Sequence, residues 1–204
     1  LELLAPAGNL DAVIAAVQNG ADAVYMGFGD GFNARRSADN FTRESFAKAV
    51  RYCHIRGCKV YVTLNTLVGD REMEAAAALA QQASDAGADA ILVQDLGLAR
   101  VLRAALPDIP LHASTQMSIH NLAGVEAAAE MGITRAVLAR ELSLEQIRFI
   151  SQHASIETEV FVHGALCFCY SGQCYMSALI GRRSGNRGAC AQPCRMQYSM
   201  GGRM

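Results

Sequence analysis

The chain has 204 residues, of which 51% are hydrophobic and 18% charged, and its formal net charge is −1. These values predict a folded domain with a sizeable core and exclude disordered and low-complexity proteins. No apolar run is long enough to span a membrane, and seven cysteines, an odd number, argue against a secreted disulfide scaffold, so we expect a cytoplasmic protein without a membrane partner.

Short apolar runs rich in β-branched residues alternate with Ala- and Leu-rich helical stretches. The predicted strands are Glu2–Pro6, Ala23–Gly27, Lys59–Leu64, Ala90–Gln94, Leu111–Ser114, Arg135–Ala139 and Glu159–His163. The predicted helices are Leu10–Asn19, Arg43–Arg56, Arg71–Ala86, Gly97–Ala105, Leu122–Met131 and Leu144–His153. Four of them are preceded by capping residues, Asn9, Thr42, Asp70 and Ser143. The strict alternation predicts a parallel sheet with right-handed crossovers.

Two architectures, a doubly wound sheet and a (β/α)8 barrel, have this alternation. The stretch "APAGNL" after the first strand lacks the G-x-G-x-x-G fingerprint of dinucleotide-binding sheets. Nearly every predicted strand instead ends in polar residues, namely Asn65 and Thr66, Gln94 and Asp95, Ser114 to Gln116, Arg140 and Glu141, and His163. Polar residues at the carboxyl ends of strands build the active face of a barrel. We therefore predict an α/β fold, a TIM-type (β/α)8 barrel truncated after about seven strands.

The organisation along the chain divides it into two parts. Residues 1–164 form the predicted barrel core, and residues 165–204 form a segment rich in Cys, Arg and Gly. The chain starts without Met and stops at "YSMGGRM" with no closing helix. We expect a fragment of a longer protein, with the rest of the barrel and a C-terminal domain lying beyond Met204.

Charge is distributed unevenly along the chain. After Glu159 there is no Asp or Glu, yet this part holds five arginines, Arg182, Arg183, Arg187, Arg195 and Arg203. A basic segment without acids indicates an anionic partner or an anionic cluster, and the alternative is a solvated basic surface.

Five cysteines follow the last predicted strand, whereas Cys53 and Cys58 are most simply small buried residues. The five are Cys167, Cys169, Cys174, Cys190 and Cys194. There is no C-x-x-C pair among them, which argues against a dithiol oxidoreductase. Their spacing leaves three alternatives open: ligands of zinc or an iron–sulfur cluster, buried structural thiols, or a nucleophile. Glycines between them, including Gly164, Gly172 and Gly188, allow the backbone to wrap closely around a cluster.

The stretch "EVFVHGALCFCYSGQCYMS", Glu159 to Ser177, resembles the signature of the collagenase-like peptidase family U-32. The stretches "ELLAPAG", "NGADAVYMG", "VYVTLNT", "HASTQ", "VLARELSL" and "SGNRGACAQPCR" also look like this family. The resemblance covers essentially the whole chain and implies a barrel followed by C-terminal elements. It is strongest to the branch that hydroxylates ribosomal RNA.

The resemblance implies several activities. The family name implies proteolysis, while other members are implicated in oxygen-independent or prephenate-linked hydroxylation of a ribosomal RNA cytidine, a transfer RNA uridine or the ubiquinone ring. It also implies an iron–sulfur cluster, expected to be of the 4Fe–4S type. Four cysteines match the cluster ligands of the family: Cys167, Cys174, Cys190 and Cys194. Cys169 falls at a variable position and is expected to be a packing thiol.

The two main chemistries make different demands on the remaining residues. A peptidase needs a nucleophile, a base such as His163 and an orienting third group, and the sequence shows no such third group. Hydroxylation needs a redox centre, which clustered thiolates supply. We therefore predict Fe–S-dependent hydroxylation of an RNA base, with a peptidase as the alternative and a scaffold or partner subunit in quinone-ring hydroxylation as a second alternative.

The predicted site residues follow from this choice. The candidates on the barrel face are Asn65, Gln116, Arg140, Glu141 and His163. Asn65, Gln116, Arg140 and Glu141 would hold the base or a small oxygen donor, although Arg140 and Glu141 could instead form an ion pair that closes their loop. Arginines bind phosphate bidentately and stack on bases, so Arg182, Arg183 and Arg187 are the predicted RNA contacts. A protein or peptide is the alternative substrate, and the chain could form an oligomer.

Overall fold

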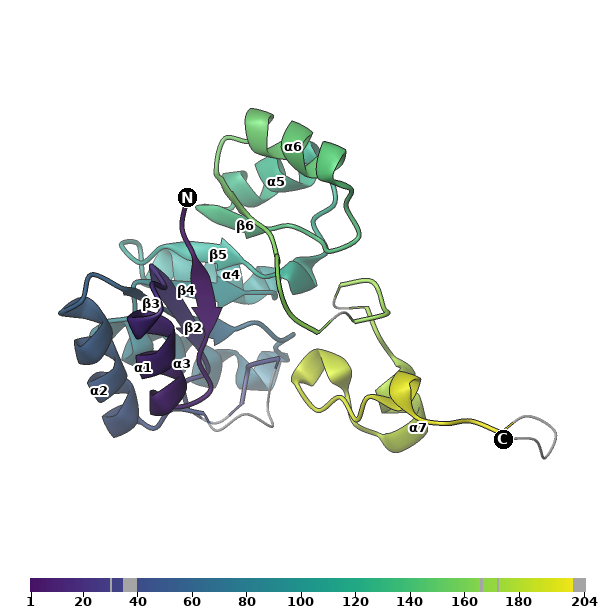
Figure 1. The fold of residues 1–204 in the computed structure, drawn as a ribbon, viewed down its shortest axis with the longest axis horizontal. Coiled ribbons are helices and arrows are strands. Elements are labelled where there is room, and N and C mark those ends of the chain that lie inside the picture. The colour runs from purple at the N-terminus through teal and green to yellow at the C-terminus, as the bar shows by residue number, and fades with distance from the viewer. Residues whose placement is uncertain (30, 35–39, 166, 172, 200–204) are drawn as a thin grey trace.

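The computed structural model describes residues 1–29, 31–34, 40–165, 167–171 and 173–199. Within them one parallel sheet has seven strands, and each strand pairs with the strand before it in the sequence, in the order β1 to β7 (Figure 1). The strands are β1 (Leu4–Pro6), β2 (Ala23–Met26), β3 (Lys59–Leu64), β4 (Ala90–Val93), β5 (Leu111–Ala113), β6 (Arg135–Val137) and β7 (Glu157–Glu159). The predicted parallel alternation is confirmed.

Helices connect the strands and cover the outer face of the sheet (Figure 1). They are α1 (Leu10–Gln18), α2 (Arg43–His54), α3 (Met73–Asp85), α4 (Leu96–Ala105), α5 (Leu122–Glu130) and α6 (Leu144–His153). Helix α7 (Met176–Gly181) follows the last strand and lies apart from the sheet, in the C-terminal part of the chain (Figure 1). Single turns of 3-10 helix occur at η1 (Asp70–Glu72), η2 (Thr115–Met117), η3 (Gly185–Arg187) and η4 (Pro193–Arg195). None of the helices in the described ranges has the length and apolar character needed to cross a membrane.

The sheet is curled, with apolar residues on both of its faces. Along β3, Val60, Val62 and Leu64 pack outward against helices, while Tyr61 points inward. The inner cluster also contains Ala23, Ala90, Leu92 and Val137, from three further strands. Alternate side chains of a strand point to opposite faces, so a sheet with two buried faces reads as a continuous apolar run. This arrangement is a truncated (β/α)8 barrel, as predicted.

Charged residues meet on the inner face near the amino ends of the strands. Arg135, whose side chain is 9% exposed, contacts Glu2 before β1 at 2.5 Å and Glu157 in β7 at 2.6 Å. Burial alone would raise the pKa of Glu2, but hydrogen bonds from Arg135 and Tyr61 outweigh it and lower that pKa to about 2. Arg135 therefore ties β1 to the far end of the sheet and fixes its curl.

Two details differ from the sequence-based prediction. The last strand ends at Glu159 rather than at His163, because the register of β7 on β6 pairs Arg135 with Glu157 and Val137 with Glu159. Asp70 does not cap a helix: η1 starts at Asp70 with Gly69 as its cap residue, and α3 follows from Met73. The caps predicted at Asn9, Thr42 and Ser143 are confirmed, each accepting a backbone N–H in the first turn.

Candidate functional site

Strands β3, β4 and β5 end in amide and hydroxyl side chains that form one hydrogen-bonded network. Asn65 Nδ2 donates to Ser114 Oγ at 3.2 Å, and Asn65 Oδ1 accepts from the amide of Ala34 at 2.9 Å. Gln116 Nε2 donates to the carbonyl of Asn65 at 2.9 Å, and Gln94 Nε2 donates to the carbonyl of Gln116 at 3.3 Å. The predicted candidates Asn65 and Gln116 are therefore brought together.

Two buried oxygens at these strand ends have no hydrogen-bond partner among the described residues. They are Thr66 Oγ1 and Gln94 Oε1, on side chains that are 1% and 6% exposed. A carbonyl only accepts hydrogen bonds, so the carbonyl of Gln116 requires Gln94 to turn its Nε2 toward it, which leaves Oε1 unpaired. An unpaired buried polar atom costs about 1–3 kcal/mol and in native proteins is typical of functional sites and ordered water.

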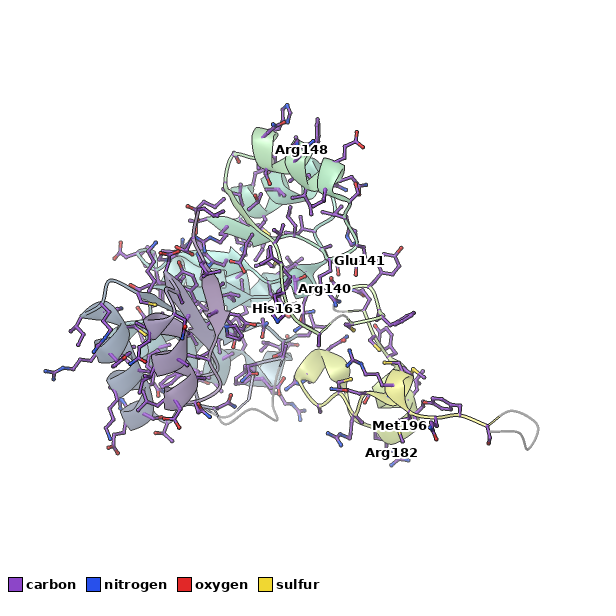
Figure 2. The ribbon with its side chains drawn as sticks, in the orientation of Figure 1. Arg140, Glu141, Arg148, His163, Arg182 and Met196 are labelled. Carbon is purple, nitrogen blue, oxygen red and sulfur yellow. The ribbon has the colours of Figure 1, made fainter. Side chains whose placement is uncertain are left out.

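Arg140 and Glu141, which follow β6, bind residues 167–174, here called the first cysteine segment. Arg140 Nη2 donates to the carbonyl of Cys169 at 3.2 Å, and Nη1 donates to that of Cys167 at 3.5 Å. Glu141 Oε1 accepts from the amide of Ser171 at 3.0 Å. Figure 2 shows both residues on the side that faces the chain returning after β7. Among the described ion pairs Arg140 and Glu141 are not partners, so both residues serve the cysteine segment.

Ser171 is the point at which the first cysteine segment is attached to the barrel. Its side chain is completely buried, and its Oγ accepts from Arg140 Nε at 3.2 Å and lies 3.3 Å from Glu141 Oε2. Its amide donates to Glu141, and its carbonyl accepts from the hydroxyl of Ser118 after β5. All three polar groups of Ser171 are thus satisfied by residues that follow β5 and β6.

His120 lies on the other side of Glu141. Its Nδ1 is 2.5 Å from the carbonyl of Ser118, which can only accept, so Nδ1 carries a proton. Its Nε2 is 3.4 Å from Glu141 Oε2 but outside hydrogen-bond geometry, and it has no other partner among the described residues. The ring of His120 lies 5.9 Å from the ring of Tyr170, between centroids. His120 thus connects the first cysteine segment with the start of α5.

The seven cysteines have free thiols and fall into two environments. Cys53 and Cys58 are buried in the outer core, as predicted, and burial raises the pKa of the Cys53 thiol to about 12. In the first cysteine segment Cys167 is exposed, while Cys169 and Cys174 are half-buried. Burial, and then the neighbouring thiol of Cys174, raise the pKa of Cys169.

Residues 185–195, here called the second cysteine segment, have anchors of their own. Ser177 Oγ, on a side chain 1% exposed, accepts from the amide of Ala191 at 2.9 Å. Arg187 binds both oxygens of Glu72 at 2.7 and 2.8 Å and the carbonyl of Leu67 at 3.1 Å. The Arg187 hydrogen bonds lower the pKa of Glu72 to about 2. Cys190 and Cys194 in this segment are exposed.

Arg182 and Arg183 lie at the end of α7, on the C-terminal part of the chain. Arg182 is exposed, with φ of +54°, and Figure 2 places it on the outer side of this part. Arg183 Nε donates to the carbonyl of Ala189 at 3.0 Å. Of the three predicted RNA-contacting arginines, only Arg187 has its guanidinium paired with a carboxylate in the described structure.

The remaining predicted site residues are a histidine and three glycines that lie close to the cysteines in the sequence. His163 is exposed and follows the end of β7 by four residues. Gly164 and Gly188 have φ of +145° and +73°, a region that favours glycine, and Gly188 is also buried. Gly172 lies outside the described residues.

Three polar residues of this site were not predicted from the sequence: Ser171, Ser177 and His120. Ser171 occupies a variable position of the family-like signature and gives no signal in a single sequence. Ser177 does belong to that signature, and its burial explains why a hydroxyl is needed there. His120 gives no local signal either, because its contact with Glu141 joins two different loops.

The donor chemistry of the two cysteine segments suits a soft metal, because thiolates bind iron and zinc strongly. In the described part of the chain, no three His, Cys, Asp or Glu side chains are arranged as ligands of one metal ion. The thiols of Cys174 and Cys167 nevertheless both contribute to the raised pKa of Cys169. The residue types therefore fit a cluster, and both segments have fixed attachment points from which their thiols extend.

Comparison with known proteins assigns the chain to a family. The family model described as peptidase family U32 matches residues 8–203. The chain is 46% identical to the 23S rRNA 5-hydroxycytidine C2501 synthase of Escherichia coli, over 98% of the chain and 30% of that protein. It is 41% identical to the tRNA hydroxylation protein P1 of Bacillus subtilis, over 98% of the chain and 47% of that protein. The chain therefore spans less than half the length of these relatives.

The fold has a solved counterpart. The structure of the U32 peptidase Mk0906 superposes with a TM-score of 0.67 at 18% identity, over 82% of this chain and 70% of that one. At this identity the likeness concerns the fold alone. It agrees with the curled parallel sheet described above.

Proposed function

The chain belongs to peptidase family U32, and we propose that it is part of an enzyme that hydroxylates a pyrimidine base of ribosomal or transfer RNA in the cytoplasm. The observation that carries this proposal is the attachment of the first cysteine segment to the carboxyl ends of β5 and β6 through Ser171. This attachment supports a site in which the thiols lie near the amide and hydroxyl groups at the strand ends, since Thr115 Oγ1 is 3.4 Å from Ser171 Oγ. The names of the two relatives, a 5-hydroxycytidine synthase and a tRNA hydroxylation protein, support the same reaction class.

We propose that Cys167, Cys174, Cys190 and Cys194 hold an iron–sulfur cluster of the 4Fe–4S type. Such a cluster supplies one-electron transfer when bound. Two separately anchored segments would each contribute two thiols, and the attachment points at Ser171 and Ser177 hold the segments in place. Gly164 and Gly188 permit the backbone turns beside these cysteines.

The other residues bind and orient the substrates in this proposal. Asn65 and Gln116 present a neutral, hydrogen-bonding surface that suits a base edge better than a phosphate. Replacing a ring hydrogen by hydroxyl is a two-electron oxidation, so the site must also take an organic oxygen donor that is reduced in the exchange. We assign Arg140 and Glu141 to holding the first cysteine segment, and His163 stays a candidate proton carrier.

We assign the phosphate contacts of RNA to Arg182 and Arg183. Both lie in a part of the chain without acidic residues, so their charge is not cancelled by nearby carboxylates of that part. Arg187 instead binds Glu72 and orients the second cysteine segment. Replacing Arg182 and Arg183 by Glu is expected to weaken RNA binding in a salt-dependent manner.

The decisive experiment measures modified nucleosides. RNA from cells lacking the gene is digested and examined by mass spectrometry for the loss of a hydroxylated pyrimidine. Wild-type protein is expected to restore the nucleoside, and the variants Cys167→Ser and Cys190→Ser are expected not to. Cys58→Ser is the matched control, because this thiol lies in the outer core away from both segments. An unchanged nucleoside pattern in the deletion strain would overturn the proposal.

A second measurement tests the cluster itself. The full-length protein is purified without oxygen, and its iron content and visible absorption are recorded. Wild type and Cys58→Ser are expected to bind iron, and Cys167→Ser and Cys190→Ser to lose it. A protein that stays free of iron after reconstitution would contradict the cluster, whatever the nucleoside experiment shows.

A peptidase is the second candidate, and one contact favours it. Glu141 Oε2 lies 3.4 Å from His120 Nε2, and a carboxylate brought into hydrogen-bond geometry there would be the orienting group that a peptidase base needs. Gelatin cleavage that is lost in His120→Ala while iron stays bound would support this candidate. A scaffold or partner subunit in quinone-ring hydroxylation stays a prediction, as does oligomer formation.

A further inference from the structure

A groove of about 350 Å³ runs between the start of α5 and one face of α6, next to the candidate site. This volume lies within the range of small-molecule sites. Its apolar lining comes from Leu122 and Ile150, and its aromatic lining from His120 and Phe149. Phe149 is 54% exposed, although it is a large apolar side chain on a well-formed helix. The groove therefore offers one accessible aromatic ring above an apolar floor.

Polar groups with unused hydrogen-bonding capacity surround this ring. Asn121 Oδ1 accepts from the amide of Gly124, and Gln146 Oε1 accepts from the amide of Ser143. These caps leave the amide nitrogens of Asn121 and Gln146 as donors without a partner among the described residues. Glu145 adds a carboxylate acceptor to the lining. Flat apolar contact combined with donors and an acceptor at its rim is the chemistry that recognises a nucleobase.

The groove is connected to the cysteine-bearing part of the molecule through His120. One side of this ring lines the groove, its Nε2 lies 3.4 Å from Glu141, and its ring lies 5.9 Å from that of Tyr170. Glu141 in turn holds the amide of Ser171. Tyr170 is 64% exposed and extends the aromatic surface toward the first cysteine segment.

We propose that this groove binds the base of an unpaired RNA nucleotide that flanks the modified one. The inference rests on the proposed function and adds to it that the substrate RNA is single-stranded at the site. The base stacks on Phe149, and the adjacent base of the RNA stacks on Tyr170. The carboxylate of Glu145 keeps the phosphate out of the groove, and the exposed Arg148 on the same helix is placed to meet it outside (Figure 2).

The test uses the full-length protein and an unstructured RNA of about ten nucleotides, a length within the site sizes of single-strand binders. One nucleotide is 2-aminopurine, whose fluorescence falls on stacking. Phe149→Ala is expected to weaken binding by roughly 10-fold and to abolish the fluorescence change, since stacking contributes substantially per base. Leu144→Ala is the matched control, because this side chain is exposed on the same helix but does not line the groove.

The outcomes separate this inference from the proposed function. If Phe149→Ala and Tyr170→Ala both bind and quench like the Leu144→Ala control, the groove is not a base site. If the double variant Arg182→Glu, Arg183→Glu is nevertheless weakened, RNA binding itself stands. If the wild-type protein binds no RNA, both proposals fall. Circular dichroism of each variant shows that the barrel is intact, as expected for exposed side chains.

Discussion

The two ends of the sheet are held by different chemistry. At the amino ends of the strands, Arg135 lies on the inner face among Glu2, Glu157 and Glu159, and these contacts join the first strand to the last. At the carboxyl ends, neutral amides and hydroxyls bond to one another, and two buried oxygens there stay unpaired. Charged groups predominate at one end and neutral hydrogen-bonding groups at the other. Each end also keeps buried polar atoms without a hydrogen-bond partner among the described residues, and at the amino end these are Glu159 Oε2 and His112 Nδ1.

This difference separates stability from function. In barrels of this type the amino-end face serves stability and the carboxyl-end face carries the chemistry. A charge removed from a buried cluster leaves its partners uncompensated, so the penalty reaches the whole fold. Removing a hydroxyl that anchors a cysteine segment at the carboxyl-end face should loosen only that segment. The following four changes test this contrast, from the largest expected effect to the smallest.

Arg135→Ala is expected to have the largest effect. It removes the buried cation shared by Glu2 and Glu159, leaves Glu2 only the exposed Lys59, and should lower the free energy of unfolding by about 3–5 kcal/mol. Urea titration measures this loss, and Arg135→Lys, which keeps one charge, should lose less. A loss below about 1 kcal/mol would show that the cluster does not fix the curl of the sheet.

His112 should make the amino end sensitive to acid. Burial, and then the charge of Arg135, lower its pKa from 6.5 to about 3. Because the folded-state pKa is depressed, the stabilisation is complete above about pH 6.5 and is lost as the pH falls toward 3, by up to about 1.4 kcal/mol per pH unit. His112→Phe, which can still pack on Tyr61, should flatten this dependence.

The window between pH 6.5 and 4.5 isolates His112, because Glu2 responds only as the pH falls from 4.5 toward 2. Burial raises the pKa of Glu159, and its response therefore has the opposite sign. Glu159 is present in both wild type and His112→Phe, so its contribution cancels in the difference between their free energies of unfolding. Equal pH dependence of the two proteins in this window would contradict the prediction.

Ser171→Ala should act locally at the carboxyl end. Loss of its Oγ contacts is expected to speed amide hydrogen exchange in residues 167–171 by roughly 10-fold, since a hydrogen bond to a charged group contributes about 1.5–3 kcal/mol. The urea midpoint should barely change. Ser177→Ala is the matched control and should loosen the second cysteine segment instead. An equal response of both segments to either variant would show that they are not anchored separately.

Arg187→Met should have the smallest effect. The Arg187–Glu72 pair lies near the surface, with side chains 41% and 38% exposed, and such pairs contribute little to stability. Faster exchange of residues 185–190 is expected at low salt, with an unchanged urea midpoint. Lys48→Met, which breaks an exposed pair within α2, should leave that exchange unaltered. A lower urea midpoint would instead show that this ion pair stabilises the whole fold, as the amino-end cluster is expected to do.

The sequence predicts the order and type of the elements well, because each strand is a compact apolar run and six helices carry regular apolar spacing. It misplaces the last strand because Val160, Phe161 and Val162 look like a buried run, although they are 37%, 49% and 85% exposed. The pairing of Arg135 with Glu157 sets the register there, and a contact between residues of different strands leaves no local pattern.

The candidate site was predicted in its residue types and only partly in its contacts. Polar strand ends pointed to Asn65 and Gln116, and the structure joins them. The partners of Arg140 and Glu141 were not predictable, because Ser171 reaches them from 30 residues away and one serine among many carries no distinctive signal. The ion pair between Arg187 and Glu72 joins residues 115 positions apart, so it too was not predictable from a local pattern.

The sequential order of the strands bears on how the chain is assembled during synthesis. Each strand pairs with the one made just before it, so each new strand and helix can dock as soon as it emerges. The bond from Arg135 to Glu2 joins residues 133 positions apart and waits for β6 to be made. Until then Glu2 can pair only with the exposed Lys59 of β3. The ion cluster can therefore form only once β6 has joined the sheet, when there are enough strands for the sheet to curl.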